Sequence, residues 1–133
     1  MWIVSRSVTV WQVAVPYRHL LAGVLAVIGG AIDLVSVAAF VRARTTINPL
    51  APSRAGQLVI SGMFRFSRNP MYLGMLLILC GAAVWFGQPL NVLILALFVW
   101  VITLVQIKPE EAALTEKFGE RYLDYCRRVR RWL

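Results

Sequence analysis

Three groups of polar residues in this largely apolar chain are candidates for binding or catalysis. Asp33 lies inside an apolar run, Arg68 to Gly74 open another such run, and Glu110 and Glu111 are adjacent carboxylates. A carboxylate at membrane depth is costly, so it usually faces the protein interior or a wet cavity. For Asp33 the sequence leaves two interpretations equally open: a protonated or hydrogen-bonded packing residue, or a contact for a cation or a substrate.

The segment from Arg68 to Gly74 also has a complete structural explanation. Asn69 is a favourable N-cap, and Pro70 suits the first position of a helix. Gly74 could equally be a packing glycine. From these residues alone, the structural explanation is favoured over a functional one. No metal site is expected, because the single histidine, His19, has no potential ligands nearby and the two cysteines match no zinc-site spacing.

The elements that position these residues must be membrane-spanning helices. The chain has 133 residues, of which 59% are hydrophobic and 15% are charged. A soluble domain of this size could not bury so much apolar surface, and a disordered chain would be far more polar. We therefore expect an all-α integral membrane protein with a single domain over residues 1–133.

Three apolar runs predict three full transmembrane helices. The first covers residues 19–41, and the other two form a tight antiparallel hairpin over residues 71–107, with Gln88 and Pro89 at its turn. Residues 1–18 form a short apolar segment that is only a partial span. Small residues at a spacing of four, Ala22, Ala26 and Gly30, predict the close-packing face of the first helix.

The basic residues indicate the orientation. The chain has 14 lysines and arginines against six acidic residues, a formal charge of +8. Five of the cations lie in the loop 42–70 and seven in the tail 108–133. Both segments flank the hairpin, so they share one side, and the positive-inside rule places that side in the cytoplasm. The charge then reflects topology and attraction to anionic lipid head groups rather than nucleic-acid binding.

The tail 108–133 is expected to be helical and amphipathic. Pro109 suits a first helical position, and apolar residues recur at spacings of three and four from Leu114 to Trp132. Gly119 is a candidate break between two helices. The simplest interpretation is a helix that lies on the membrane surface.

Taken together, these motifs resemble a known superfamily. Arg68-Asn69-Pro70-Met71-Tyr72-Leu73-Gly74 resembles the Arg-His-Pro-x-Tyr-x-Gly signature of the isoprenylcysteine carboxyl methyltransferase and phospholipid N-methyltransferase superfamily. A charge-free hairpin and then Pro109-Glu110-Glu111 follow in the same order as in that family. The segment Thr45-Thr46-Ile47-Asn48-Pro49 looks like the loop of its small bacterial members. The resemblance covers residues 31–133, and longer relatives have a complete span where residues 1–16 provide half.

The resemblance implies an integral-membrane methyltransferase that uses S-adenosylmethionine, without a metal, in the bacterial inner membrane. Its acceptor would be a membrane-borne amphiphile, either an isoprenoid or prenylcysteine-type carboxylate or a lipid amine. The implied cofactor-binding residues are Arg68, Asn69, Pro70, Tyr72, Gly74, Glu110 and Glu111. Tyr122, Tyr125 and Arg131 are implied to close the pocket or to contact the substrate as catalytic residues. Asn69 stands where many relatives have histidine, which removes a titratable group and puts a general-base role there in question.

The residue types suit this cofactor. A glutamate can accept hydrogen bonds from its ammonium group or ribose diol, and Arg68 can pair with its carboxylate in a bidentate manner. Tyr72 can stack on the adenine. Methyl transfer is an in-line displacement, so the protein mainly has to align the reacting groups.

Two other functions stay open. One is a small proton- or cation-coupled transporter that uses Asp33, although the long tail and the unbroken, charge-free hairpin argue against it. The other is a non-enzymatic scaffold or an inactive relative. The sequence identifies neither the methyl acceptor nor the oligomeric state.

Overall fold

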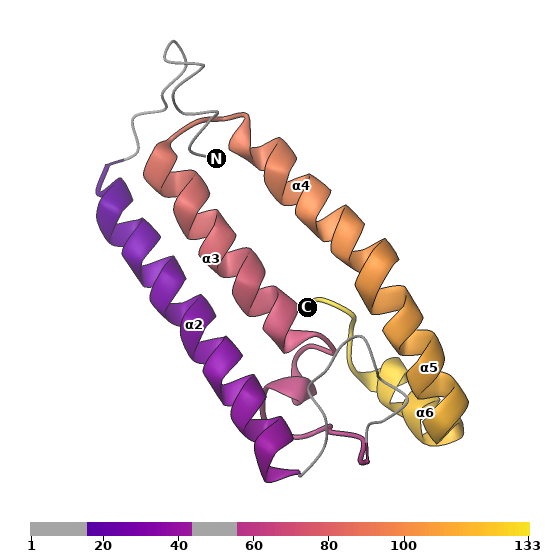
Figure 1. Ribbon diagram of the computed structural model, residues 1–133. Coiled ribbons are helices and arrows are strands. Elements are labelled where there is room, and N and C mark those ends of the chain that lie inside the picture. Colours follow the sequence, from indigo (N-terminus) through magenta and orange to yellow (C-terminus); the bar gives the residue numbers. More distant parts are fainter. Residues whose placement is uncertain (1–15, 44–55) are drawn as a thin grey trace.

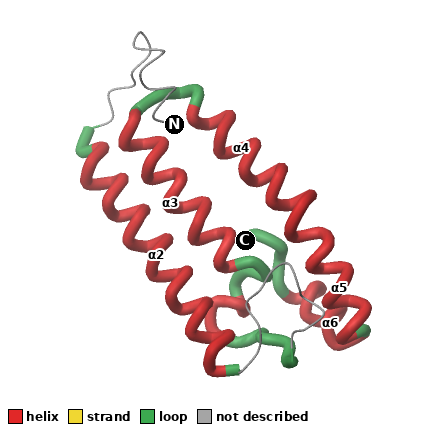
Figure 2. The backbone as a smooth tube through the Cα atoms, in the orientation of Figure 1, coloured by secondary structure: helices red, strands yellow, loops and turns green. Residues whose placement is uncertain are grey.

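The computed structural model describes residues 16–43 and 56–133, and the regular elements in these residues are all helical (Figures 1 and 2). The prediction of an all-α fold is therefore confirmed for this part of the chain. The elements, in chain order, are α2 (Arg18–Arg42), the 3-10 helix η2 (Gly62–Arg65), α3 (Pro70–Phe86), α4 (Asn91–Ile102), the π-helical segment η3 (Thr103–Ile107), α5 (Lys108–Phe118) and α6 (Glu120–Arg128).

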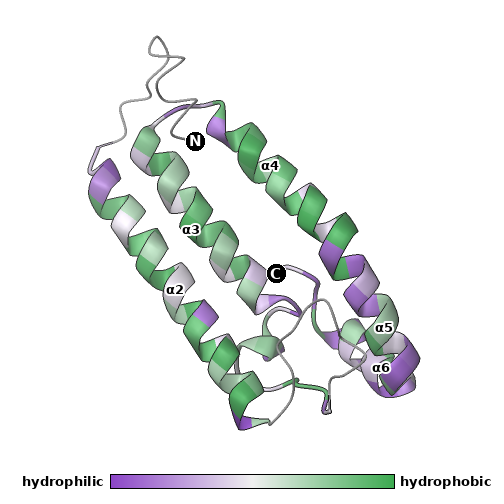
Figure 3. Cartoon of the chain, viewed as in Figure 1, coloured by the Kyte–Doolittle hydropathy of each residue, from purple (hydrophilic) through white to green (hydrophobic). Residues whose placement is uncertain are grey.

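Within the described residues, two helices are long and apolar enough to cross a membrane. They are α2 and the continuous helix Asn91–Phe118, whereas Pro70–Phe86 is apolar but shorter. Apolar residues cover α2, α3 and α4 along most of their length, and polar residues gather at the end that carries α5 and α6 (Figure 3). The expected first span, 19–41, agrees with α2 to within one residue at each end. Of the expected partial span 1–18, residues 1–15 lie outside the described residues, as does the loop Thr45–Pro49.

α2 and α3 pack closely because small residues line their contact. The buried residues of α2 are Ala22, Gly29 and Ser36, at a spacing of seven. A Cβ atom on Gly29 would lie 2.6 Å from the carbonyl oxygen of Gly74, and one on Gly81 would lie 2.8 Å from that of Ala22. The two backbones therefore approach too closely for any larger side chain at these glycines.

The predicted small-residue face was only partly right. Ala22 lies on the contact, but a Cβ atom on Gly30 would meet nothing within 4 Å, so Gly30 points away from α3. On an α-helix, residues four apart differ by about 40° in direction, whereas residues seven apart differ by only about 20°. Residues seven apart on α2 therefore stay on the side that faces α3, whereas residues four apart turn away from it.

Asp33 also faces this contact. A Cβ atom on Gly74 would fall against the Asp33 carboxylate. Its Oδ1 atom is buried and has no hydrogen-bond partner among the described residues. The carboxylate is thus directed toward the protein, as expected for an acid in an apolar helix.

The hairpin turn between α3 and α4 lies at the expected place but covers four residues, 87–90, rather than the expected two. α3 ends at Phe86, and Gly87 adopts a left-handed conformation with φ 63° while its N–H donates to the carbonyl of Ala83 at 3.0 Å. Glycine is favoured at this position because it carries no Cβ. The Asn91 N–H then donates to the Gln88 carbonyl and starts the return helix.

The boundary expected between residues 107 and 108 is not a break in the helix. The helix continues from Asn91 to Phe118 with Pro109 in its interior. Just before the proline, η3 is a π turn in which the Lys108 N–H donates to the Thr103 carbonyl, five residues back. Proline has no N–H and its ring clashes with the carbonyl four residues back, and the wider turn relieves both problems.

The tail contains two helices separated at Gly119, as the sequence predicted. Gly119 has φ 53° and ψ −131°, a conformation that favours glycine. The apolar side of α6 does not lie on the membrane surface, however. Tyr122, Tyr125 and Val129 form a buried cluster with Val59 and Phe64 of the segment before α3. The expected surface helix is therefore packed onto the protein.

Candidate functional site

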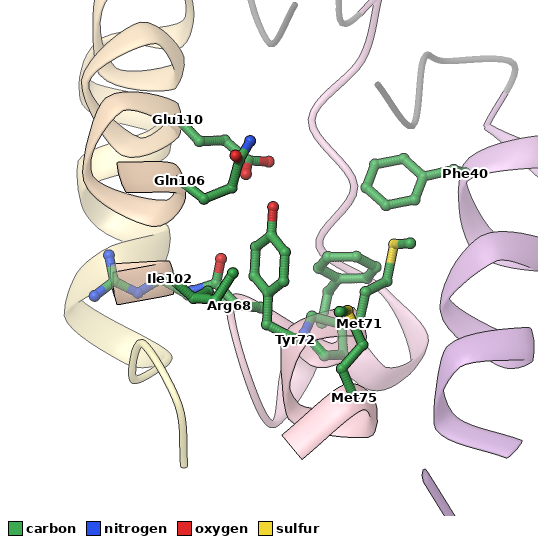
Figure 4. Close-up of a pocket in the computed structure, with 11 residues that line it drawn as sticks. Phe40, Arg68, Met71, Tyr72, Met75, Ile102, Gln106 and Glu110 are labelled. Atoms are coloured by element: carbon green, nitrogen blue, oxygen red, sulfur yellow. The ribbon is translucent and has the colours of Figure 1, made fainter. Parts of the chain in front are cut away.

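A cavity of about 320 Å³ lies where the end of α2, the start of α3 and the junction of α4 with α5 meet (Figure 4). Such volumes are typical of small-molecule sites. It is lined by Phe40, Phe64, Arg68, Asn69, Pro70, Met71, Tyr72, Met75, Ile102, Gln106 and Glu110. The structure thus brings the two motifs together, although more than 30 residues separate them in the sequence.

The cavity has one polar wall and one apolar wall. The Tyr72 hydroxyl points toward Gln106 and Glu110 and interacts with both (Figure 4). Across from these groups lie Phe40 and the methionines Met71 and Met75. Methionine adapts to irregular apolar partners because its side chain is unbranched and flexible. The cavity is therefore suited to an amphiphilic ligand, or to a polar ligand beside an apolar one.

Arg68 connects this cavity to the tail. Its side chain is only 13% exposed, and its Nη1 lies 3.2 Å from Oε1 of Glu111. The same nitrogen donates to the Cys126 sulfur at 2.7 Å. Its Nε is buried and has no partner among the described residues. A buried guanidinium N–H without a partner is costly, so this atom could donate to a bound ligand.

Glu111 does not line the cavity but holds two arginines. Arg131 donates to its two oxygens in a bidentate pair, from Nε at 2.9 Å and from Nη2 at 2.8 Å. These hydrogen bonds raise the pKa of the Arg131 guanidinium above its ordinary value. Bidentate pairs of this kind are among the stronger polar contacts in proteins.

Asn69 occupies the N-cap position of α3, and Pro70 is the first helical residue, as predicted. The Asn69 side chain makes no capping hydrogen bond, so that part of the prediction was wrong. Instead, Nδ2 donates to the carbonyl of Arg131 at 2.9 Å. The neighbouring Arg68 N–H donates to the carbonyl of Arg130 at 3.0 Å. The start of α3 therefore binds the backbone of the C-terminal segment.

The remaining predicted site residues lie away from the cavity wall. Tyr122 and Tyr125 are buried in the cluster that α6 forms with the segment before α3. Burial raises the pKa of both hydroxyls. The Tyr125 hydroxyl donates to the Phe64 carbonyl at 2.6 Å. Gly74 lies at the contact with α2. Its location fits the packing role that the sequence had left open.

The chain matches the model of one protein family, described as phospholipid methyltransferase, over residues 17–121. It belongs to the phospholipid methyltransferase family. The match includes both motifs of the cavity, Arg68 to Gly74 and Glu110-Glu111.

Individual relatives support this membership. The chain is 36% identical to the protein-S-isoprenylcysteine O-methyltransferase of Rattus norvegicus over 111 residues, which are 81% of this chain and 38% of that protein. It is 33% identical to the protein-S-isoprenylcysteine O-methyltransferase B of Arabidopsis thaliana over 73 residues, 55% of this chain and 37% of the relative. The chain thus spans less than two-fifths of the length of these two enzymes.

A bacterial relative is shorter. The chain is 46% identical to an uncharacterized protein of Haemophilus influenzae over 63 residues, which are 47% of this chain and all of that protein. No solved structure matches the chain significantly.

Sequence reasoning missed part of the cavity of this family member. Gln106 is a polar residue near the end of an apolar run, four residues before Glu110, a spacing that places side chains near one another on a helix. That signal could have identified it. The apolar lining residues, such as Phe40 and Met75, carried no signal because they look like any other residues of a membrane helix.

Proposed function

We propose that this protein catalyses S-adenosylmethionine-dependent methyl transfer to a membrane-borne amphiphilic acceptor. The acceptor would be an isoprenoid or prenylcysteine-type carboxylate, or a lipid amine. The observation that carries the proposal is the cavity, because it joins the Arg68–Tyr72 motif to Glu110 beside an apolar wall. Membership of the phospholipid methyltransferase family supports the reaction, and the names of the rat and plant relatives support the acceptor class.

The lining residues fit the cofactor chemically. Glu110 offers a carboxylate to an ammonium group or a ribose diol, and Tyr72 offers an aromatic face beside it. The unpartnered Nε of Arg68 is a donor that suits an anionic oxygen. When bound, the cofactor supplies an electrophilic methyl group. Asn69 and Pro70 complete this side of the cavity.

In this proposal the protein contributes alignment and exclusion of water. The Tyr72 hydroxyl contacts both Glu110 and Gln106 and so helps to hold the Glu110 side chain in place. Phe40, Met71 and Met75 receive the hydrocarbon part of the acceptor, which would arrive from the bilayer. Holding the two reactants in a dry, fixed arrangement is the main source of rate enhancement for an in-line displacement.

The proposal includes an orientation. We propose that α3 spans the membrane together with α2 and Asn91–Phe118, and that the segment 56–69 and α6 lie in the cytoplasm of a bacterial cell. The positive-inside rule supports this, because the basic residues concentrate at that end. The cavity then lies at the membrane surface, where a polar cofactor and a lipid-borne acceptor can meet.

Binding of S-adenosylmethionine tests the function. Isothermal titration calorimetry on the full chain in detergent should detect binding, and Glu110→Gln should weaken it at least about tenfold, since hydrogen bonds to charged groups contribute roughly 1.5–3 kcal/mol. Glu116→Gln is the matched control, because Glu116 is an exposed carboxylate on the same helix. Folded wild-type protein that does not bind the cofactor would contradict the proposal, as would equal affinities of the two variants.

A proton- or cation-coupled transporter is the second candidate, because the Asp33 Oδ1 is buried without a partner among the described residues. This function predicts proton-coupled flux in liposomes that Asp33→Asn abolishes. Flux that survives the substitution, or no flux at all, would remove the candidate.

A further inference from the structure

The two adjacent glutamates differ in what they contact. Glu110 lines the cavity and interacts with Tyr72. Glu111 contacts Arg68 and Arg131 and is absent from the lining. Neighbouring residues on a helix point about 100° apart, so the two carboxylates leave α5 in different directions.

We infer that Glu111 is a positioning residue that ties Arg68 and the C-terminal segment, Val129–Leu133, to α5. Of the two glutamates, only Glu110 acts inside the cavity. The inference replaces the direct cofactor-binding role that the sequence suggested for Glu111. The part that concerns Glu110 rests on the proposed function. The part that concerns Glu111 rests on contacts within the protein.

Charge balance supports the assignment. The Glu111 side chain is 17% exposed and the Arg68 side chain 13%, so both charges are largely removed from water. Arg131 makes its bidentate pair with the same carboxylate. One carboxylate therefore compensates two guanidinium groups. Removing it would leave the largely buried Arg68 guanidinium beside that of Arg131 without a compensating charge, which is unfavourable.

Backbone contacts show what this ion pair positions. The Arg131 carbonyl accepts from the Asn69 side chain, and the Arg130 carbonyl accepts from the Arg68 N–H. After α6, Val129 has an extended conformation, and the chain returns toward the start of α3 (Figure 1). Glu111 thus holds the side chain of Arg131, and Asn69 holds its backbone carbonyl. Arg68, which lines the cavity, is fixed between them.

Hydrogen exchange on the full chain in detergent tests the assignment without any cofactor. Glu110→Gln and Glu111→Gln are isosteric changes at adjacent positions, so each controls for the other. We expect Glu111→Gln to increase exchange of the Arg68 and Val129 amides about tenfold or more, because these N–H groups donate where the segment is held and the charge-assisted contacts that fix it are lost. Glu110→Gln should leave this exchange as in the wild type. Equal exchange in the two variants would overturn the inference.

A second variant protects the test against misfolding. Arg131→Gln breaks the same pair from its more exposed side and keeps the contact of Arg68 with Glu111. It should also increase exchange of the Arg68 and Val129 amides, and Arg131→Lys should restore part of the protection because it keeps the charge but loses the bidentate geometry. An Arg131→Gln protein that exchanges like the wild type would refute the positioning role.

Cofactor affinity distinguishes positioning from direct binding. In an Arg131→Gln background, Glu111→Gln should cause a smaller loss of S-adenosylmethionine affinity than it does alone, because only its contact with Arg68 remains to be lost, whereas Glu110→Gln should cause its full loss. Fully additive losses for Glu111 and Arg131 would contradict the inference. If the wild type binds no cofactor, the proposed function fails, and the exchange measurement still decides the role of Glu111.

Discussion

At the scale of single residues, one hydroxyl group attaches α6 to the rest of the molecule. Tyr125 is buried, and its hydroxyl donates to the Phe64 carbonyl at 2.6 Å. The sequence suggested a role for this residue near the substrate, and the structure gives it a structural contact. A buried carbonyl that loses its donor is costly, so this hydrogen bond should contribute measurably to stability.

Replacing Tyr125 tests that contact. Tyr125→Phe should lower the free energy of unfolding by about 1–2 kcal/mol, since the Phe64 carbonyl is left buried without its donor. Chemical denaturation of the full chain in detergent measures the change. Tyr17→Phe is the control, because Tyr17 is 83% exposed and its removal should have almost no effect. Equal stability of Tyr125→Phe and the wild type would contradict the assignment.

The same residue predicts how stability depends on pH. Burial raises the pKa of Tyr125 above its ordinary value of 10.0. The unfolded chain therefore ionises first as the pH rises, so the contribution of the hydroxyl is complete below pH 10.0 and is lost above it. Tyr125→Phe should lose less stability than the wild type between neutral pH and strongly alkaline pH.

At the scale of elements, the contact between α2 and α3 depends on glycines at particular positions. A Cβ atom on Gly74 would lie 2.7 Å from the Gly29 carbonyl, which is backbone and cannot move aside cheaply. At Gly30 the same atom would meet nothing within 4 Å. The two positions therefore differ in what an alanine would encounter, although both are glycines in apolar helices.

Alanine at these two positions gives a matched prediction. Gly74→Ala should destabilise the protein by about 1–3 kcal/mol because the helices must separate. Gly30→Ala should be neutral or stabilising by up to about 1 kcal/mol, the difference in helix propensity. Thermal unfolding followed by circular dichroism compares them. If both variants unfold at the same temperature, the helices do not contact each other as described.

The junction of α4 and α5 shows how an element positions a functional group. Pro109 was expected to start a separate helix, but the π turn at Thr103–Ile107 lets the helix continue through it. Gln106 lies in this turn and Glu110 follows the proline. The direction in which both side chains point therefore depends on one irregular turn, which hydrophobic periodicity could not predict.

At the scale of the whole molecule, the distribution of charge defines two ends. Polar residues gather at the end that contains α5 and α6, and the opposite end carries the turn around Gln88 and Pro89 (Figure 3). The cavity belongs to the polar end, since Arg68 and Glu110 line it. The proposed orientation therefore also states on which side of the membrane the cofactor would be bound.

Labelling of single cysteines tests the orientation. In a background with Cys80→Ala and Cys126→Ala, a membrane-impermeant maleimide should label Leu90→Cys in intact cells. It should label Arg128→Cys only after permeabilisation. Both positions are exposed, so access to the compartment rather than burial decides the result. The reverse pattern would place the cavity outside the cytoplasm.

Features that depend on local composition and on the spacing of apolar residues could be predicted from the amino-acid sequence. These are the helical class, the bounds of α2, the tight hairpin turn, the break at Gly119 and the motifs of the family. Each follows from a run of neighbouring residues, whose apolar content, glycines and prolines act within one element.

Which side chains contact one another became clear from the packing of the helices. Gly29 rather than Gly30 faces α3, Asn69 binds the Arg131 carbonyl rather than capping its own helix, and Glu110 and Glu111 separate onto different partners. Each outcome depends on the rotation and distance of elements that are remote in the sequence. The spacing of apolar residues determines which side of a helix is apolar. Which neighbour that side contacts depends on how the helices pack together.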